Sequence, residues 1–252
     1  MLSKLNKLFI NSVIIVITVS LSGIMLHELS HFLVAKELGI KAIYHSDHVI
    51  LTKNPHEWDK IIVAFSGPLF SLIFGVVMLA ISYQTKKGSI LKLLLIWCGL
   101  YNIASFLGYT LISPFVNTGD TGIVLRYFNI PIWVRLVISL ISYLILRYIF
   151  PIFTNQFIIY TNPNQNEQSS KDLFTYPLLI SILFIFIISQ PVATWISILP
   201  IIFVPFSFIG IIKKYNKIIR TKMPTELFTI DRTYPILILL CITTAIIFVI
   251  FK

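Results

Sequence analysis

The chain has 252 residues, of which 57% are hydrophobic and 12% are charged, and its mean hydropathy is +0.89. This composition excludes an ordinary soluble domain and is typical of a protein that crosses a membrane several times. The formal net charge is +10 at pH 7, but the basic residues lie at the ends of apolar runs and in one segment near residues 213–232. We interpret that distribution as contact with the headgroups of a lipid bilayer, and we expect no nucleic-acid partner.

The first predicted element is a helix over residues 8–38, ended by Gly39. It is about 31 residues long, or roughly 46 Å, which exceeds the roughly 30 Å of a hydrocarbon core. Lys4 and Lys7 precede this helix as in a signal peptide, but no small-residue cleavage site follows. We therefore expect the helix to be retained as a membrane span.

The last third of this helix contains the sequence His27-Glu28-Leu29-Ser30-His31. Residues four apart lie on one face of a helix, so His27 and His31 can present two imidazole nitrogens to one metal ion. A catalytic zinc usually takes one more protein ligand and keeps a water molecule, and Glu28 is placed to act as the base on that water. Each charged group at mid-bilayer costs about 2.5 to 3.5 kcal/mol, which favours a functional pattern over an accidental one.

A polar segment, residues 40–60, follows the first helix. Its short apolar stretches, residues 42–44 and 49–51, predict a small hairpin at the membrane interface. The segment also contains His45 and His48, and a histidine pair in a loop is more often solvated than bound to metal. Both remain candidates for the third ligand at this point.

The second and third helices are predicted over residues 61–83 and 90–113. Near the start of the second helix, Gly67 allows another backbone to approach closely and Pro68 frees a carbonyl group, so this place can lie beside the metal. Glycine and proline are also common in membrane helices that have no site. Asn102 on the third helix is a polar side chain at membrane depth, and we expect an interhelical hydrogen bond for it.

Turn residues interrupt the apolar pattern at residues 114–122, before a fourth helix predicted over residues 131–150. This turn contains Asp120 between Gly119 and Gly122. After the His27–His31 motif, this carboxylate between two glycines is the second candidate functional position in the chain.

The polar segment 154–172 predicts a connection between two parts of the chain. Before it, residues 1–153 would form a core of four helices around the predicted metal site, and after it residues 173–252 would form a C-terminal membrane region. The apolar run 173–212 is too long for one crossing, so it predicts two helices joined by a hairpin near residues 189–191.

A basic loop, residues 213–233, and a last helix, residues 235–251, complete the prediction. The predicted fold is an all-α integral membrane protein with about seven transmembrane helices. Its zinc site would lie between the first helix and the connection of the third and fourth helices.

Taken together, the motifs resemble the site-2-protease class of intramembrane zinc metallopeptidases, peptidase family M50. In that family a His-Glu-x-x-His helix is followed by a Gly-Pro motif on the next core helix and by an Asp-Gly motif two helices later. The resemblance covers roughly residues 8–150. It implies one zinc per chain, held by His27, His31 and Asp120, with Glu28 as the catalytic residue.

The chain departs from the family pattern at three positions. Ser71 and Leu111 stand where the second and third family motifs usually have asparagine, and Thr121 interrupts the Asp-Gly pair. These differences leave the ligand set intact but remove the expected amide donors to substrate or oxyanion. The residues that could replace those donors or pack beside the site are Gly67, Pro68, Ser71, Asn102 and Asn117.

Elimination among the acidic residues favours the same third ligand. Only Glu28 and Asp120 lie in segments that we expect below the headgroups, whereas the other acidic residues fall in loops or at helix ends. The alternative is that Asp120 caps the helix that follows it.

The resemblance implies an intramembrane endopeptidase that cleaves a membrane-embedded protein or peptide, in a multi-pass protein of the cell membrane. One alternative is the prenyl-protein type of membrane zinc protease, whose third ligand is a glutamate from a later helix. Here the later glutamates, Glu167 and Glu226, fall in predicted loops. The other alternative is a metal transporter or metal-binding protein, but the second half of the chain has almost no polar groups for an ion path.

Overall fold

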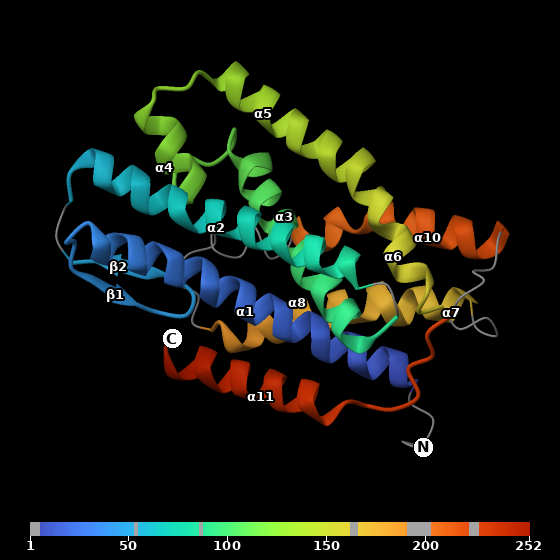
Figure 1. Cartoon of the computed structure of the whole chain (residues 1–252). Helices are drawn as coiled ribbons and strands as arrows, with labels where there is room; N and C mark the ends of the chain where they lie inside the picture. The colour runs from blue at the N-terminus through green and yellow to red at the C-terminus, as the bar shows by residue number, and fades with distance from the viewer. Residues whose placement is uncertain (1–5, 53–54, 86–87, 162–165, 191–202, 222–226) are drawn as a thin grey trace.

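A computed structural model describes the chain over residues 6–52, 55–85, 88–161, 166–190, 203–221 and 227–252. The described residues form a bundle of helices with one two-stranded sheet at one end (Figure 1). Within these described ranges, five helical segments are long and apolar enough to cross a membrane: Lys7–Glu37, Glu57–Gln84, Ile90–Ile112, Ile132–Ile158 and Gln168–Ile188. The prediction of an all-helical membrane protein is confirmed.

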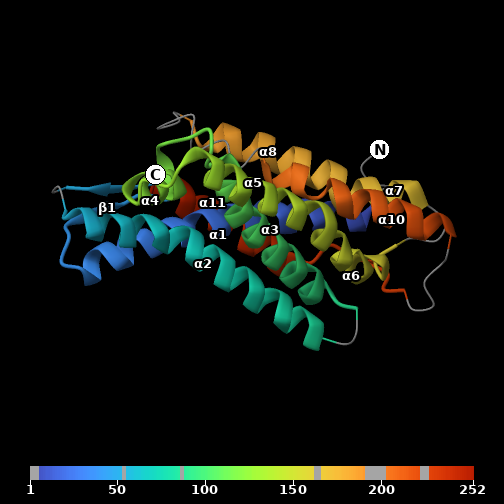
Figure 2. The same ribbon diagram turned by 90° about the horizontal axis from the view of Figure 1, so that it is seen from above.

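Helix α1 (Lys7–Glu37) lies inside the bundle and packs against α2, α3, α8 and α11 (Figures 1 and 2). Its predicted end is confirmed, because Gly39 has a φ of 71°. The N–H of Gly39 donates to the carbonyl of Lys36 at 3.0 Å, and the N–H of Ile40 donates to that of Ala35 at 2.9 Å. These two bonds satisfy the last helical carbonyls in the way that a left-handed glycine allows.

The predicted hairpin is also present, as strands β1 (Ala42–Tyr44) and β2 (Val49–Leu51) in antiparallel register. The turn between them receives the end of α11 (Pro235–Ile250). The N–H of Ser46 donates to the carbonyl of Phe251 at 2.9 Å, and its hydroxyl donates to that of Phe248 at 2.7 Å. The hairpin therefore joins the end of the first helix to the end of the last one.

Helices α2 (Glu57–Gln84) and α3 (Ile90–Ile112) form an antiparallel pair. Their backbones touch where Gly75 meets Gly99. A Cβ atom added to Gly75 would lie 2.8 Å from the carbonyl oxygen of Gly99, and one added to Gly99 would lie 2.9 Å from that of Gly75. Small residues thus set the spacing of this pair, as is common in membrane bundles.

The connection between α3 and the fourth predicted helix differs from the prediction. It contains a helix, α4 (Gly119–Tyr127), where only a turn was expected. The fourth predicted helix begins as α5 (Ile132–Leu144) and continues in helical form to Ile158, eight residues beyond its predicted end. It includes a π-helical turn at Ile145–Ile149 and a 3-10 turn at Phe150–Phe153, followed by α6 (Thr154–Ile158).

The predicted polar connection, residues 154–172, is helical at both of its described ends. Helix α6 lies in its first part, and α7 (Asn166–Ser170) leads through a π-helical turn into α8 (Tyr176–Ile188). Helix α8 ends at Ile188, where the predicted hairpin begins, but residues 191–202, with the rest of that hairpin and much of the helix after it, fall outside the described residues. Five candidate spans and the shorter apolar α11 therefore correspond to six of the roughly seven predicted helices.

The predicted basic loop over residues 213–233 is wrong in its first part, because residues 209–221 form helix α10. Ile211, Tyr215 and Ile219 recur every four residues on this helix and are buried. Burial of these three side chains stabilises the helix, although its charged sequence suggested a loop.

One core extends across both predicted parts of the chain. Trp97 of α3 is fully buried and stacks on Phe208 with a centroid distance of 4.8 Å. It also meets the rings of Phe157 and Phe174 at 5.6 and 5.9 Å. Trp97 and aromatic rings from three other segments therefore hold α3 against later parts of the chain.

Candidate metal centre

Helix α1 presents two histidines on its buried face. His27 is 4% exposed and His31 is 5% exposed. Their rings meet edge to face with a centroid distance of 4.8 Å. This is the arrangement that the four-residue spacing predicts for side chains one turn apart.

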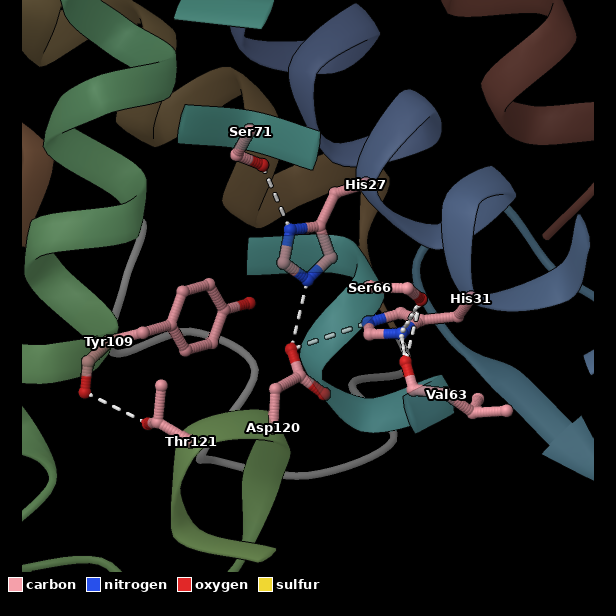
Figure 3. A network of polar contacts seen from close by, with 8 residues as sticks. All are labelled: His27, His31, Val63, Ser66, Ser71, Tyr109, Asp120 and Thr121. Atoms are coloured by element: carbon pink, nitrogen blue, oxygen red, sulfur yellow. Dashed lines mark hydrogen bonds and ion pairs between the residues drawn. The ribbon is translucent and has the colours of Figure 1, made fainter. Parts of the chain in front are cut away.

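Asp120 reaches both rings from the first turn of α4 (Figure 3). Its Oδ2 atom lies 2.9 Å from Nε2 of His27 and 3.4 Å from Nε2 of His31. One ligand atom from each of the three residues lies within 4.8 Å of the other two, so the group could hold a metal ion. Ligand atoms around a tetrahedral zinc are about 3.3 Å apart, close to the two separations between Asp120 and the histidines.

Two glycines allow α4 to aim Asp120 in this direction. Gly119 begins the helix with a φ of 75°, a conformation that side-chain-bearing residues rarely adopt. A Cβ atom on Gly122 would lie 2.8 Å from the carbonyl carbon of Asn117 and 2.9 Å from the carbonyl oxygen of Val116. The turn can therefore fold tightly against α4 only because residue 122 has no side chain.

The second nitrogen of each ring is hydrogen-bonded to α2. Nδ1 of His31 lies 2.6 Å from the carbonyl oxygen of Val63, and Nδ1 of His27 lies 3.0 Å from the hydroxyl of Ser71. A carbonyl only accepts hydrogen bonds, so Nδ1 of His31 carries a proton. In a neutral ring Nε2 then has its lone pair available, which is the state that metal-binding histidines adopt.

Nε2 of His31 is a buried polar atom without a hydrogen-bond partner among the described residues. Its contact with Asp120 has the distance of an ion pair but makes no hydrogen bond. A buried nitrogen left in this way costs free energy unless another group binds it. The donor set of two imidazoles and one carboxylate therefore fits a divalent cation such as zinc.

Gly67 of α2 lies directly against the ring atoms that face Asp120. A Cβ atom at this position would lie 2.6 Å from Nε2 of His27 and would approach Nε2 of His31 even more closely. The glycine of the predicted Gly-Pro pair thus keeps open the space beside both nitrogens.

Tyr109 is a residue of the centre that the sequence did not indicate. Its ring stacks on His27 with a centroid distance of 5.2 Å and an interplanar angle of 12°. The hydroxyl of Thr121, next to Asp120, donates to the carbonyl of Tyr109 at 3.0 Å and so ties α4 to the end of α3. No motif points to Tyr109, because the contact depends on where α3 ends relative to α1.

No protein-family model, curated protein or solved structure matches the chain. The functional interpretation therefore rests on the residues of the centre themselves.

The other predicted site residues lie at different distances from this centre. Glu28 follows His27 on α1 and is half-buried, and Pro68 is buried in α2 next to Gly67. The amide of Asn102 donates to the carbonyl of Cys98 on its own helix. Asn117 accepts a hydrogen bond from Arg135 at 2.8 Å, which anchors the turn before α4 to α5.

The rival third ligands, His45 and His48, are engaged elsewhere. Their rings stack on each other with a centroid distance of 4.4 Å. Nδ1 of His45 lies 2.7 Å from the carbonyl oxygen of Lys252, and Nδ1 of His48 lies 2.8 Å from a carboxylate oxygen of Asp47. Among the described residues, the metal-binding group contains neither of them.

Proposed function

We propose that this chain is an intramembrane zinc endopeptidase that hydrolyses a peptide bond within or near the membrane segment of another protein or peptide. One observation carries the proposal. Asp120 of α4 meets His27 and His31 of α1, a candidate membrane-spanning helix that also bears Glu28. Two imidazoles and one carboxylate, with a further glutamate beside the first histidine, form the donor set and the base that zinc-dependent hydrolysis requires.

A bound zinc ion supplies a Lewis acid for the scissile carbonyl and lowers the pKa of a water molecule to near neutrality. The residues around it provide binding, orientation and proton transfer. Glu28 accepts the proton of the attacking water and delivers it to the leaving amine. The Val63 carbonyl holds His31 in the tautomer that leaves Nε2 available, and the Ser71 hydroxyl can do the same for His27 by accepting from its Nδ1.

The site lies among packed helices, so a substrate helix has to unwind locally before its carbonyl can reach the centre. Backbone groups released in this way need partners within protein, since lipid offers none. The substrate class that fits is therefore a membrane segment with a weak or interrupted helix.

The identity of the third ligand separates this proposal from the prenyl-protein type of zinc protease, which uses a glutamate. The carboxylate beside the histidines is that of Asp120. A metal transporter is the other alternative, and it would bind metal without any need for Glu28.

The test compares the wild-type chain with Glu28→Gln and with Glu37→Gln, a control at the exposed end of the same helix. Each purified protein is analysed for its zinc content. Each variant is also expressed in the organism that naturally produces the protein, and new peptide termini in membrane proteins are quantified by mass spectrometry. We expect Glu28→Gln to keep one zinc per chain and to lose the cleavage products, and Glu37→Gln to keep both. Unchanged products in Glu28→Gln would exclude hydrolysis at this centre, and a wild-type protein without metal would exclude the centre itself.

A further inference from the structure

Helix α10 (Ile209–Thr221) separates its basic and apolar residues onto different faces. It contains no acidic residue, and its cationic side chains are Lys213, Lys214, Lys217 and Arg220. Lys213, Lys217 and Arg220 are exposed, and spacings of four and three residues place them on one side of the helix, with the half-buried Lys214 next to Lys213. We call these four residues the basic face of α10.

The apolar face of α10 is already occupied by the protein. Ile211 and Tyr215 are fully buried, and the Tyr215 ring meets Phe174 edge to face at 5.3 Å. The Tyr215 hydroxyl is hydrogen-bonded to that of Thr161 at 2.7 Å. Since this face is committed to the core, the helix does not insert sideways into lipid, and its basic face points outward.

Contacts with the neighbouring span place this basic face at the membrane boundary. A Cβ atom on Gly210 would lie 2.8 Å from Cγ of Pro151, inside the candidate span Ile132–Ile158. Tyr215 pairs with Thr161, three residues after that span has ended. Lys213, Lys214 and Lys217 therefore lie about where the hydrocarbon gives way to headgroups.

The same end of the bundle contains the start of α1 and helix α7 (Figures 1 and 2). Lys7 and Lys171 are exposed there. The nearby carboxylate of Asp172 is buried and accepts hydrogen bonds from the amides of Asn6 and Gln168. It is directed at those amides and so does not neutralise the basic face.

Among the described residues, no carboxylate forms an ion pair with Lys213, Lys214 or Lys217. Lysines held at a membrane surface attract anionic headgroups, and clusters of four or more basic residues are typical of such contacts. We propose that the basic face of α10 is a binding surface for anionic phospholipid headgroups. This contact fixes the depth of the bundle at the end opposite to the metal centre.

The experiment uses the full chain in nanodiscs of phosphatidylcholine and phosphatidylglycerol. Trace amounts of a photoactivatable form of either lipid are added, and cross-linked peptides are identified by mass spectrometry. The test variant combines Lys213→Gln, Lys214→Gln and Lys217→Gln. The matched control combines Lys36→Gln, Lys41→Gln and Lys60→Gln at the other end of the bundle. Cross-links to the lipid-exposed residues of α11 serve as the internal reference.

We expect the anionic probe to label α10 of the wild-type chain at least about fivefold more than the neutral probe, the preference that one surface lysine supports. The test variant should show no preference at α10, and the control variant should keep it. High salt should remove the preference from the wild type by screening, which tests the proposal even if the triple variant does not fold. Equal labelling of wild-type α10 by both probes, or an unchanged preference in the test variant, would overturn the proposal.

Discussion

The two histidines of the metal centre use their two ring nitrogens for different purposes. Nε2 faces Asp120, while Nδ1 is held by α2. The bond from His27 to Ser71 depends on a side chain and can be removed, unlike the bond from His31 to a backbone carbonyl. A substitution of Ser71 can therefore test whether the hydrogen bond to Nδ1 of His27 helps this ring to bind metal.

We expect Ser71→Ala to weaken zinc binding by about tenfold or more, the range found when the partner of a metal-bound histidine is removed. The control is Ser82→Ala on the same helix, because Ser82 is equally buried and its hydroxyl donates to the carbonyl of Leu79, away from the metal centre. Competition with a zinc chelator measures both affinities. Equal affinities of the two variants would show that the hydroxyl of Ser71 does not orient His27.

Position 67 tolerates a side chain less well than the sequence indicated. The sequence predicted close packing of two helices, but the atoms that approach Gly67 are the imidazole nitrogens themselves. These rings cannot move aside cheaply, since each is tied through Nδ1.

For this reason Gly67→Ala should lower zinc content to less than about a tenth of the wild-type value, and activity should fall with it. Gly108→Ala is the control, because the nearest described atom to its added Cβ, Cβ of Phe203, would lie at 3.8 Å. Metal analysis of both purified proteins checks the prediction. Full zinc occupancy in Gly67→Ala would mean that the nitrogens do not face α2 as described.

How far the sequence predicts the centre depends on the range of each contact. His27 and His31 follow from helical periodicity alone, and Asp120 follows from the order of motifs and from the scarcity of acidic residues in apolar segments. Tyr109 and the Val63 carbonyl could not be predicted. Their roles arise from the relative rotation of α1, α2 and α3, which no local pattern encodes.

At the scale of elements, α4 decides the third ligand. Its first turn contains Asp120, but the residue that caps it is Thr118, which makes no side-chain capping bond. The Asp120 carboxylate is directed at the histidines, so the geometry does not support a role of Asp120 as the helix cap.

Asp120→Asn should consequently lose most of the bound zinc, since an amide has no negative charge and is a poor zinc ligand. Asparagine is as good a cap as aspartate, so the helix itself should persist. Zinc content and circular dichroism, measured on the same preparation, separate the two effects. Retained zinc would mean that the third ligand lies elsewhere.

The long apolar helices were predictable because their ends have glycine, proline or capping signals. Helix α4 was missed because it is short and begins with residues that usually form turns. Helix α10 was missed because its charges suggested a loop, although the four-residue spacing of Ile211, Tyr215 and Ile219 is a helical pattern.

At the scale of the molecule, the bundle has two unlike ends. The hairpin and α4, which carries Asp120, lie toward one end, and α10 with the start of α1 lies at the other (Figure 1). If the five candidate spans cross a bilayer, these ends face opposite sides of it.

We therefore expect Thr52→Cys in the hairpin region and Thr221→Cys at the end of α10 to react with an impermeant maleimide from opposite sides of sealed vesicles. Both positions are exposed. The background replaces Cys98 and Cys241 with alanine. Labelling of both positions from the same side would mean that the hairpin and the end of α10 do not face opposite sides of the bilayer.

The sequence could not predict which helices surround α1, because those contacts join distant segments. One of them can form only late in synthesis. Asn11, fully buried in α1, donates to the carbonyl of Arg232 at 2.9 Å and accepts from the N–H of Tyr234 at 3.1 Å.

These partners follow Asn11 in the chain by 221 and 223 positions. At ribosomal speeds they emerge about 10 to 45 s after Asn11. During that interval the first helix is in the membrane with an amide that lacks its later partners. We therefore expect α1 to stay in contact with the insertion machinery or a chaperone until these partners have been made. Truncated chains ending before residue 232 should be preferred substrates for membrane quality control.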